Sequence, residues 1–319
     1  KMQNAKRGLF VIYSHFFDMI KENRVKEVVF MLLGALEGGG TKMVCAIGDE
    51  TGAVHEQISI PTETPDITIP RLLEYFRRFP IEALGIASFG PVDLNPASPT
   101  YGFITTTPKL SWANFDFMGV FKRELKIPIG FDTDVNGSAL GEQTFGCMKG
   151  VDCGIYLTVG TGVGMGVIAN GRLLHGMLHS EAGHVLLAKH PEDTFPGKCP
   201  FHPNCLESLA AGPAIEARWG RKAIELKDDE KVWELEAYYL AQAIVNYILI
   251  LSPQKIVLGG GVMHQMQLFP LIRAKVKELL NGYLHTKEIE DIDHYIVPAS
   301  LNDNQGIMGC LQLAVLAIG

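Results

Sequence analysis

The chain of 319 residues has no long uninterrupted run of apolar side chains and no excess of positive charge. A membrane-spanning helix needs about 20 apolar residues in succession, and no segment reaches that length, so we expect no membrane partner. Lys and Arg number 28 against 35 Asp and Glu, so we expect no nucleic-acid partner. A chain of this length can fold without a disulfide framework. We therefore expect four of its six cysteines, Cys45, Cys147, Cys153 and Cys310, to be buried free thiols and the protein to be cytoplasmic.

Two common nucleotide-binding motifs are also missing. Residues 38–42, Gly-Gly-Gly-Thr-Lys, do not form a G-x-x-x-x-G-K-[ST] loop, because no Ser or Thr follows the lysine. The fingerprint G-x-G-x-x-G fails because Gly160 and Gly162 would require a third glycine where Met165 stands. The sequence therefore disfavours P-loop and dinucleotide-binding domains.

A pattern of strand, glycine turn and strand occurs twice, around Gly39 and again around Gly162, 123 residues later. That spacing is about one domain length and predicts a duplicated domain. Between the two copies, short apolar strands alternate with helical segments, which is typical of an α/β fold. Strands are expected at 29–36, 43–47, 54–58, 83–88, 128–131, 154–159, 165–169, 172–174, 255–258 and 295–298. Helices are expected at 69–78, 115–125, 135–145, 212–219, 232–251, 262–283 and 307–318.

Three glycine turns follow expected strands, at residues 38–40, 160–164 and 259–261. Without a Cβ, glycine lets backbone N–H groups come close to an anion. Each turn alone is also explained as a tight turn. Three turns at strand ends, two of them in equivalent places of a repeat, indicate a nucleotide held between two domains.

An acidic segment, residues 132–134, lies between an expected strand and an expected helix. Asp is a favourable N-cap, so Asp134 could simply cap the helix. Ligand sites of α/β proteins lie at the carboxyl ends of strands, where a carboxylate can accept the proton of a hydroxyl that attacks a phosphoryl group. Both interpretations remain open, and the second requires the Asp134 side chain to face a cleft.

Cysteine and histidine are concentrated in one proline-rich segment. Cys199, His202 and Cys205 form a C-x2-H-x2-C pattern, and His184 lies fifteen residues before Cys199. Two thiolates and two imidazoles are a typical ligand set of a closed, structural Zn²⁺ site. Unliganded surface Cys and His are the alternative interpretation. Two nearby histidines are rival ligands, His179 and His190.

Several features in chain order resemble the ROK (repressor, ORF, kinase) family of sugar kinases. They are residues 36–42, the segment around Asp134, residues 160–164, the Glu-x-Gly-His sequence at 181–184, the C-x2-H-x2-C run with Glu207, and residues 258–262. Residues 88–93 (SFGPVD), 106–109 (TTPK) and 211–219 (AGPAIEARW) are most similar to bacterial zinc-containing fructokinases. The resemblance covers residues 31–319.

The resemblance implies a pair of actin-like (RNase H-like) domains with ATP and sugar in the cleft between them. It implies an N-terminal domain at 31–145 and a C-terminal domain at 146–302 that includes the zinc loop, 184–205. The last helix, about 303–319, is expected to pack back on the N-terminal domain. Residues 1–30, with six basic and three acidic side chains, are expected to be a separate N-terminal extension.

The resemblance also implies roles for individual residues. Asp134 would be the catalytic base, and Glu37, where the family often has Asp, would face Mg²⁺. The residues implied at ATP and its phosphates are Gly39, Gly40, Thr41, Lys42, Thr161, Gly162, Pro213, Gly260 and Gly261. Those implied in the sugar pocket are Gly90, Pro91, Thr107, Asp134 and Glu181. Those implied to hold structural Zn²⁺ are His184, Cys199, His202 and Cys205.

The implied function is phosphorylation of D-fructose at O6 by ATP, in an enzyme expected to be a homodimer. A glucose or mannose preference is the main alternative, since nothing in the chemistry of these side chains selects a furanose. A catalytically silent sugar-binding protein is a second alternative. A sugar-responsive repressor is a third, but residues 1–30 lack room for its winged helix–turn–helix and show no basic recognition helix.

Overall fold

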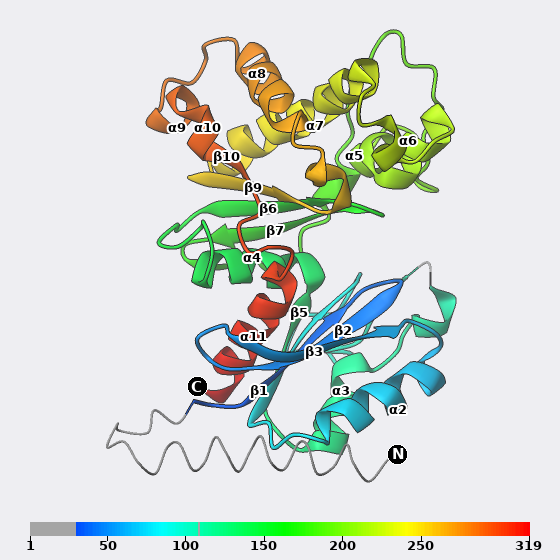
Figure 1. Ribbon diagram of the computed structural model, residues 1–319, viewed down its shortest axis with the longest axis vertical. Coiled ribbons are helices and arrows are strands. Elements are labelled where there is room, and N and C mark those ends of the chain that lie inside the picture. The colour runs from blue at the N-terminus through cyan, green and yellow to red at the C-terminus, as the bar shows by residue number, and fades with distance from the viewer. Residues whose placement is uncertain (1–29, 108) are drawn as a thin grey trace. The chain divides into compact units, whose positions relative to one another are not determined.

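The computed structural model describes residues 30–107 and 109–319. The extension predicted over residues 1–30 therefore lies outside the described residues, apart from Phe30. Among the helices of the described ranges, none is long and apolar enough to span a bilayer. Residues 32–319 form one compact unit, and this unit is built on two five-stranded sheets (Figure 1).

The first sheet has the strand order β3-β2-β1-β4-β5. Its strands are β1 (Leu33–Gly38), β2 (Lys42–Gly48), β3 (Val54–Pro61), β4 (Ala83–Ser88) and β5 (Ile129–Thr133). The first three form an antiparallel meander, whereas β4 and β5 run parallel to β1. Every residue of β4 is buried, while β3 alternates between exposed and partly buried positions, with only Ile60 buried. This difference is expected between a central parallel strand covered on both faces and an edge strand.

The second sheet repeats this arrangement with the order β8-β7-β6-β9-β10. Its strands are β6 (Gly154–Val159), β7 (Val163–Ala169), β8 (Arg172–Leu173), β9 (Lys255–Gly259) and β10 (Ile296–Pro298). Again the first three are antiparallel, and the last two run parallel to the first. The predicted α/β duplication is therefore confirmed.

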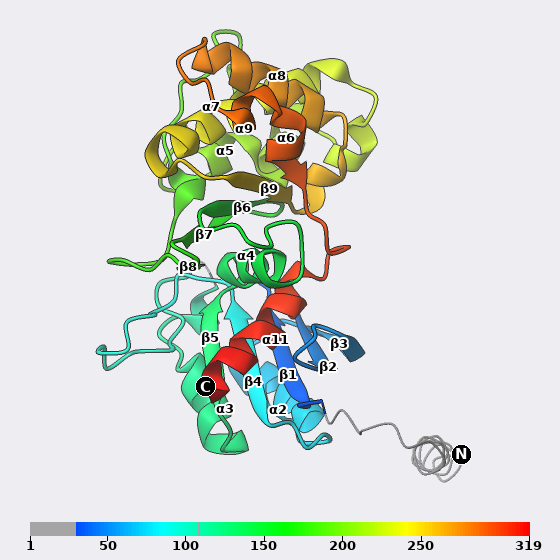
Figure 2. The same ribbon diagram turned by 90° about the vertical axis from the view of Figure 1, so that its left-hand side faces the viewer.

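Helices cover the sheets, and two of them pack against each other between the sheets. The helices are α2 (Pro65–Phe76), α3 (Phe117–Leu125), α4 (Asp134–Thr144), α5 (Leu206–Ala210), α6 (Gly212–Trp219), α7 (Glu230–Leu251), α8 (Leu268–Leu280), α9 (Lys287–Glu290), α10 (Ile292–Tyr295) and α11 (Gln305–Ile318), with short 3₁₀ turns η1 (Leu110–Trp112), η2 (Ala182–His184), η3 (Ala223–Leu226) and η4 (Gly261–His264). Helix α4 follows the first sheet but packs on β6 and β7, and α11 follows the second sheet but packs on β1, β4 and β5 (Figure 2). A Cβ on Gly309 of α11 would lie 1.7 Å from the Gly137 carbonyl of α4, so this close crossing requires glycine.

Most predicted elements agree with the structure to within three residues at each end, and three differ by more. The first strand, expected at 29–36, runs from Leu33 to Gly38. The helix expected at 69–78 is α2, which begins at Pro65, because proline fits the first turn of a helix, where no N–H donor is needed. The helix expected over 262–283 is interrupted, since Gln265 has ψ 83° between η4 and α8.

Candidate active site and metal site

The first sheet brings the carboxyl ends of three parallel strands to one edge. Gly38 at the end of β1 is opposite Ser88 of β4, and Ser88 is opposite Thr133 of β5. Glu37 and Asp134, which lie beside these positions in sequence, therefore meet at the same edge of the sheet. Parallel pairing of the strands thus brings Glu37 and Asp134 close together, although they are nearly one hundred positions apart in the sequence.

Asp134 is the first residue of α4, and the interpretation that it caps the helix is wrong. The N-cap is Thr133, whose hydroxyl accepts a hydrogen bond from the Asn136 N–H at 3.1 Å. The hydrogen bonds that the Asp134 carboxylate accepts among the described residues are local, from the Val135 N–H at 2.9 Å and from its own backbone N–H. Burial and, to a smaller extent, the nearby Glu181 carboxylate raise the pKa of Asp134 to about 6. The side chain is therefore available to accept a proton near neutral pH.

Both carboxylates line a cavity of about 270 Å³ between the two sheets. The cavity-lining residues are Glu37, Asp134, Val135, Ser138, Tyr156, Thr158, Gly260, Gly261, His264, Asp303 and Gln305. Burial raises the pKa of Glu37 to about 7, as does the Asp134 charge, while Lys42 opposes the shift. A larger hollow of about 550 Å³ lies elsewhere, against α2, and contains none of the predicted site residues.

The three glycine turns occupy different positions around this cavity. Gly260 and Gly261 line it, and Gly260 has φ 88°, a backbone conformation that favours glycine. Residues 39–41 form the β1–β2 turn and Lys42 begins β2, outside the cavity lining. Lys109 lies over this turn, because its Cε would be 3.3 Å from a Cβ placed on Gly40. The sequence reasoning assigned Lys109 no role, although a cation beside a glycine turn suits a phosphate.

The third turn, which contains Thr161 and Gly162, is fixed by two neighbouring segments. The Gly160 carbonyl accepts a hydrogen bond at 2.8 Å from Gly212 N, directly before Pro213 in α6. The Val163 N–H donates to the Glu207 carboxylate at 3.0 Å. Glu207 lies two residues after Cys205, so the metal-binding segment and the turn are directly connected.

The residues predicted for the sugar pocket come from both sheets. Gly90 and Pro91 follow β4 and are joined by a cis peptide bond, and Thr107 is buried in the loop that follows them. Glu181 precedes η2 in the second half of the chain. His179 bridges these two regions, since its Nε2 accepts the Val92 N–H at 3.2 Å and its Nδ1 lies 3.4 Å from the Glu181 carboxylate.

The four predicted metal ligands converge. One ligand atom from each of His184, Cys199, His202 and Cys205 lies within 4.8 Å of the other three. The His184 Nδ1 is 3.8 Å from Cys199 Sγ and 3.6 Å from Cys205 Sγ. The buried Nδ1 of His202 has no hydrogen-bond partner among the described residues, as expected of a nitrogen that binds a metal. The donor set and its spacing therefore fit a tetrahedral Zn²⁺ ion.

Backbone pairing explains why distant parts of the chain meet at this cluster. Leu206 N donates to the Val185 carbonyl at 3.0 Å, and Leu187 N donates to the Asn204 carbonyl at 2.9 Å. This short pairing places His184 beside Cys205. The two rival ligands lie outside the cluster: His179 binds Val92, and His190 packs edge-on against the Tyr238 ring.

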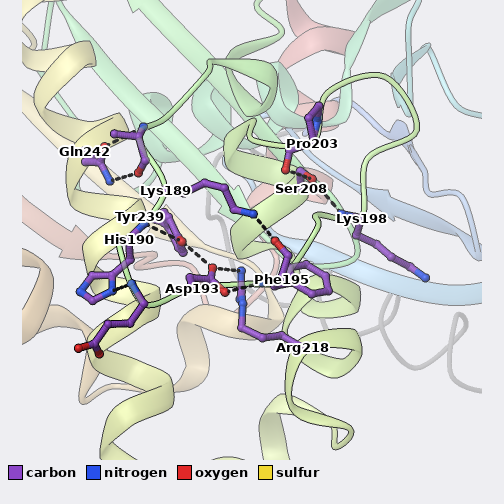
Figure 3. Close-up of polar contacts among 12 residues, drawn as sticks. Lys189, His190, Asp193, Phe195, Lys198, Pro203, Ser208, Arg218, Tyr239 and Gln242 are labelled. Carbon is purple, nitrogen blue, oxygen red and sulfur yellow. Dashed lines mark hydrogen bonds and ion pairs between the residues drawn. The ribbon is translucent and has the colours of Figure 1, made fainter.

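The loop between His184 and Cys205 is held to the helices by a polar network (Figure 3). Tyr239 of α7 donates to Asp193 at 2.6 Å, and Arg218 of α6 forms an ion pair with Asp193 at 3.2 Å. The Asp193 and Arg218 side chains are only 4% and 7% exposed. Gln242 of α7 exchanges two hydrogen bonds with the Ala188 backbone. The loop that carries the predicted metal ligands therefore has anchors that do not depend on a metal.

The sequence reasoning missed several residues of the cavity. Tyr156, Thr158 and Gln305 line it, and Gln305 donates to the Tyr156 hydroxyl at 3.0 Å. Tyr156 and Thr158 lie in an apolar strand, where they resemble ordinary strand residues. Gln305 is the first residue of α11, as Asp134 is of α4. This correspondence between the two copies of the fold was the one signal in the sequence that could have indicated Gln305.

Comparison with known proteins defines the class. The fold, with two actin-like halves, is similar to that of a solved ROK hexokinase from Thermus thermophilus. The TM-score is 0.74, with 26% identity, and the match covers 90% of this chain and 99% of that one. Residues 33–316 match the ROK family, and this chain belongs to that family. Similar curated proteins include a fructokinase of Pediococcus pentosaceus, 50% identical over 90% of this chain and 99% of its own length. A fructokinase of Streptococcus mutans is 44% identical over 89% and 97%, respectively.

Proposed function

We propose that this protein is a fructokinase that transfers the γ-phosphoryl group of ATP to O6 of D-fructose. The observation that carries the reaction type is the Asp134 carboxylate, which lies at the start of α4 in the cavity and has a pKa raised to about 6. The preference for fructose is supported by relatives named fructokinase at 44% and 50% identity over nine-tenths of the chain.

In the proposed reaction, Asp134 accepts the proton of the sugar 6-hydroxyl. The hydroxyl oxygen forms a bond to the γ-phosphorus as the bond between that phosphorus and the β–γ bridging oxygen breaks, and ADP leaves. Such transfers depend mainly on positioning and on stabilisation of phosphoryl charge. We assign that stabilisation to the backbone N–H groups of the turns at 39–41 and 160–162, and the adenosine side to Gly260, Gly261 and Pro213.

Glu37 is proposed to face the Mg²⁺ ion that accompanies ATP. Its carboxylate lines the cavity beside Asp134, and no described residue is hydrogen-bonded to it or ion-paired with it. A carboxylate is the hard oxygen ligand that Mg²⁺ prefers. Lys42, which lies close enough to lower the Glu37 pKa, is proposed to contact the phosphates.

The sugar pocket is proposed to combine Gly90, Pro91 and Thr107 from the first half with Glu181 from the second. The domain boundaries then follow the sheets, with residues 31–145 and the last helix, 303–319, in one domain and residues 146–302 in the other. Zn²⁺ held by His184, Cys199, His202 and Cys205 would fold the loop at 184–205 and offset the mutual repulsion of two thiolates. Metal loss should therefore weaken sugar binding through the segment that carries Glu181.

A coupled assay of ADP release tests this proposal. Purified protein of known zinc content is supplied with Mg·ATP and, separately, with fructose, glucose or mannose. The largest kcat/KM is expected with fructose, and the phosphorylated position is read by NMR of the product. A preference for glucose or mannose would retain the kinase and correct the substrate. No turnover of any hexose by zinc-loaded protein would overturn the proposal.

A further inference from the structure

Residues 174–181 connect the second sheet to the proposed sugar pocket, and hydrophobic burial does not hold them in place. The segment follows β8 and ends at Glu181. Leu174, Met177 and Leu178 are exposed, and Met177 is fully so. The side chains of two histidines in this segment reach across to the first half of the molecule.

His175 contacts a buried carboxylate next to the proposed base. Its Nε2 lies 2.8 Å from Asp132 Oδ2, and the Asp132 side chain is only 3% exposed. The other carboxylate oxygen of Asp132 accepts hydrogen bonds from the Thr133 N–H at 2.8 Å and the Asn136 amide at 2.7 Å. The hydrogen bond to Asp132 raises the pKa of His175, which strengthens the contact. Asp132 is thus a fixed acceptor, held by α4 itself.

His179 makes the second contact, and its partners define its tautomer. The Val92 N–H can only donate, so the Nε2 that lies 3.2 Å from it must be the unprotonated acceptor. The neutral ring then carries its proton on Nδ1, which lies 3.4 Å both from the Glu181 carboxylate and from the Ser180 carbonyl. Val92 directly follows the Gly90–Pro91 turn. His179 therefore links that turn to Glu181.

We propose that His175 and His179 are positioning residues that clamp segment 174–181 to the first half of the molecule and hold Glu181 in place before sugar binds. The inference rests on the proposed function, since it concerns the sugar side of that site. It predicts that the sugar pocket is assembled in the absence of nucleotide. Pre-organisation of this kind increases affinity by lowering the ordering cost of binding.

Single substitutions to leucine test the clamp. His175→Leu and His179→Leu should each raise the KM for fructose about tenfold, the equivalent of one charge-assisted hydrogen bond. The KM for ATP and kcat should change less than about twofold, because neither histidine lines the cavity that contains Glu37 and Asp134. His175→Gln and His179→Gln retain a donor and an acceptor and should recover most of the loss.

The chain offers a closely matched control in His55 and Asp49. This pair has the same 2.8 Å separation, and its side chains are 50% and 5% exposed, against 41% and 3% for His175 and Asp132. It closes a local turn after β2, away from the cavity. His55→Leu should leave both KM values unchanged. A rise in fructose KM that is equal in His55→Leu and His175→Leu would overturn the proposal.

Further outcomes separate this inference from the proposed function. If the wild type phosphorylates fructose and both leucine variants keep its fructose KM, the clamp is wrong and the function stands. If the wild type turns over no hexose, the function fails. The clamp is then tested by NMR titration of His175, whose pKa should fall in Asp132→Asn, and an unchanged pKa would reject it. A leucine variant that does not fold is replaced by its glutamine counterpart and by Asp132→Asn, which should raise the fructose KM.

Discussion

The two halves of the molecule share one topology but contribute different chemistry to the cavity between them. Each sheet has the same strand order, and a helix follows its last strand. Helix α4 of the first half begins with Asp134, whereas α11 of the second half begins with Gln305, and both residues line the cavity. The first half also supplies the buried Glu37, while the second supplies the uncharged Tyr156 and Thr158 and the exposed His264–Asp303 pair.

The duplicated backbone determines the position of a side chain in the cavity, whereas the residue type determines the chemistry available at that position. Burial raises the pKa values of Glu37 and Asp134, so the first half presents two carboxyl groups that titrate near neutrality. Gln305 at the corresponding helix start is neutral and donates to Tyr156. In the proposed reaction, the first half therefore supplies the proton acceptor, whereas the helix start of the second half supplies a neutral amide.

The largest expected effect comes from removing the charge at the first helix start. Asp134→Asn should lower kcat about a thousandfold, because general-base catalysis contributes about 10²–10⁴, while ATP binding measured by calorimetry is retained. The matched variant in the other half is Gln305→Ala, which should cost about 1 kcal/mol of stability through its lost hydrogen bond and far less kcat. Equal losses of kcat in the two variants would contradict the proposal that the two helix starts contribute differently to catalysis.

The metal loop is the second contrast, since it is inserted after the third strand of the second sheet, while the first sheet continues directly into α2. Cys199→Ser combined with Cys205→Ser should abolish zinc binding, measured by atomic absorption. Stability should fall by about 4 kcal/mol if free zinc is about a thousandfold above its Kd, and the fructose KM should rise. Cys153→Ser, a thiol outside the cluster, is the control. Zinc content that survives the double substitution would refute the ligand assignment.

The anchors of this loop provide a smaller, independent effect. Arg218→Met should destabilise the fold by about 3 kcal/mol, because it leaves the buried Asp193 carboxylate without its cation. Arg77→Met breaks the Arg77–Glu124 pair, whose side chains are 52% and 49% exposed, and should cost less than about 1 kcal/mol. Urea unfolding of the zinc-loaded proteins measures both values. Similar losses in the two variants would show that burial does not set the strength of this anchor.

The sequence was sufficient to predict those features whose signals are local. Glycine turns after apolar strands predicted the duplicated α/β fold, and the C-x2-H-x2-C spacing with His184 predicted the metal cluster, because residue type alone restricts what these segments can form. The start of α2 at Pro65 was missed because proline is both a helix breaker and a favourable first-turn residue.

Contacts between distant segments could not be predicted. His175 belongs to no motif and lies 43 positions from Asp132, so only the packing of the two halves brings the two side chains to 2.8 Å. The sequence placed Asp134 near the start of its helix but did not show whether its carboxylate caps that helix. Thr133 and Asp134 are both favourable N-cap residues, and only the structure shows that Thr133 is the cap. Tyr156 lies in an apolar strand and shows its polar function only opposite Gln305.

The smallest expected effect concerns pH and tests whether the charges of the first half are tuned by the second. Burial first, and then Glu181, raises the pKa of Asp134 to about 6. Because the base must be ionised, kcat/KM for fructose should fall about tenfold per pH unit below that value and level off above it. Removing the Glu181 charge with Glu181→Gln should lower the Asp134 pKa. The acid limb, the part of the pH profile in which kcat/KM falls at low pH, should therefore move to lower pH by a fraction of a unit, even though the maximal rate is reduced. His55→Leu should leave the limb in place. An acid limb that does not move in Glu181→Gln would mean that burial alone tunes Asp134, and that the second half contributes to the shape of the site but not to the strength of its base.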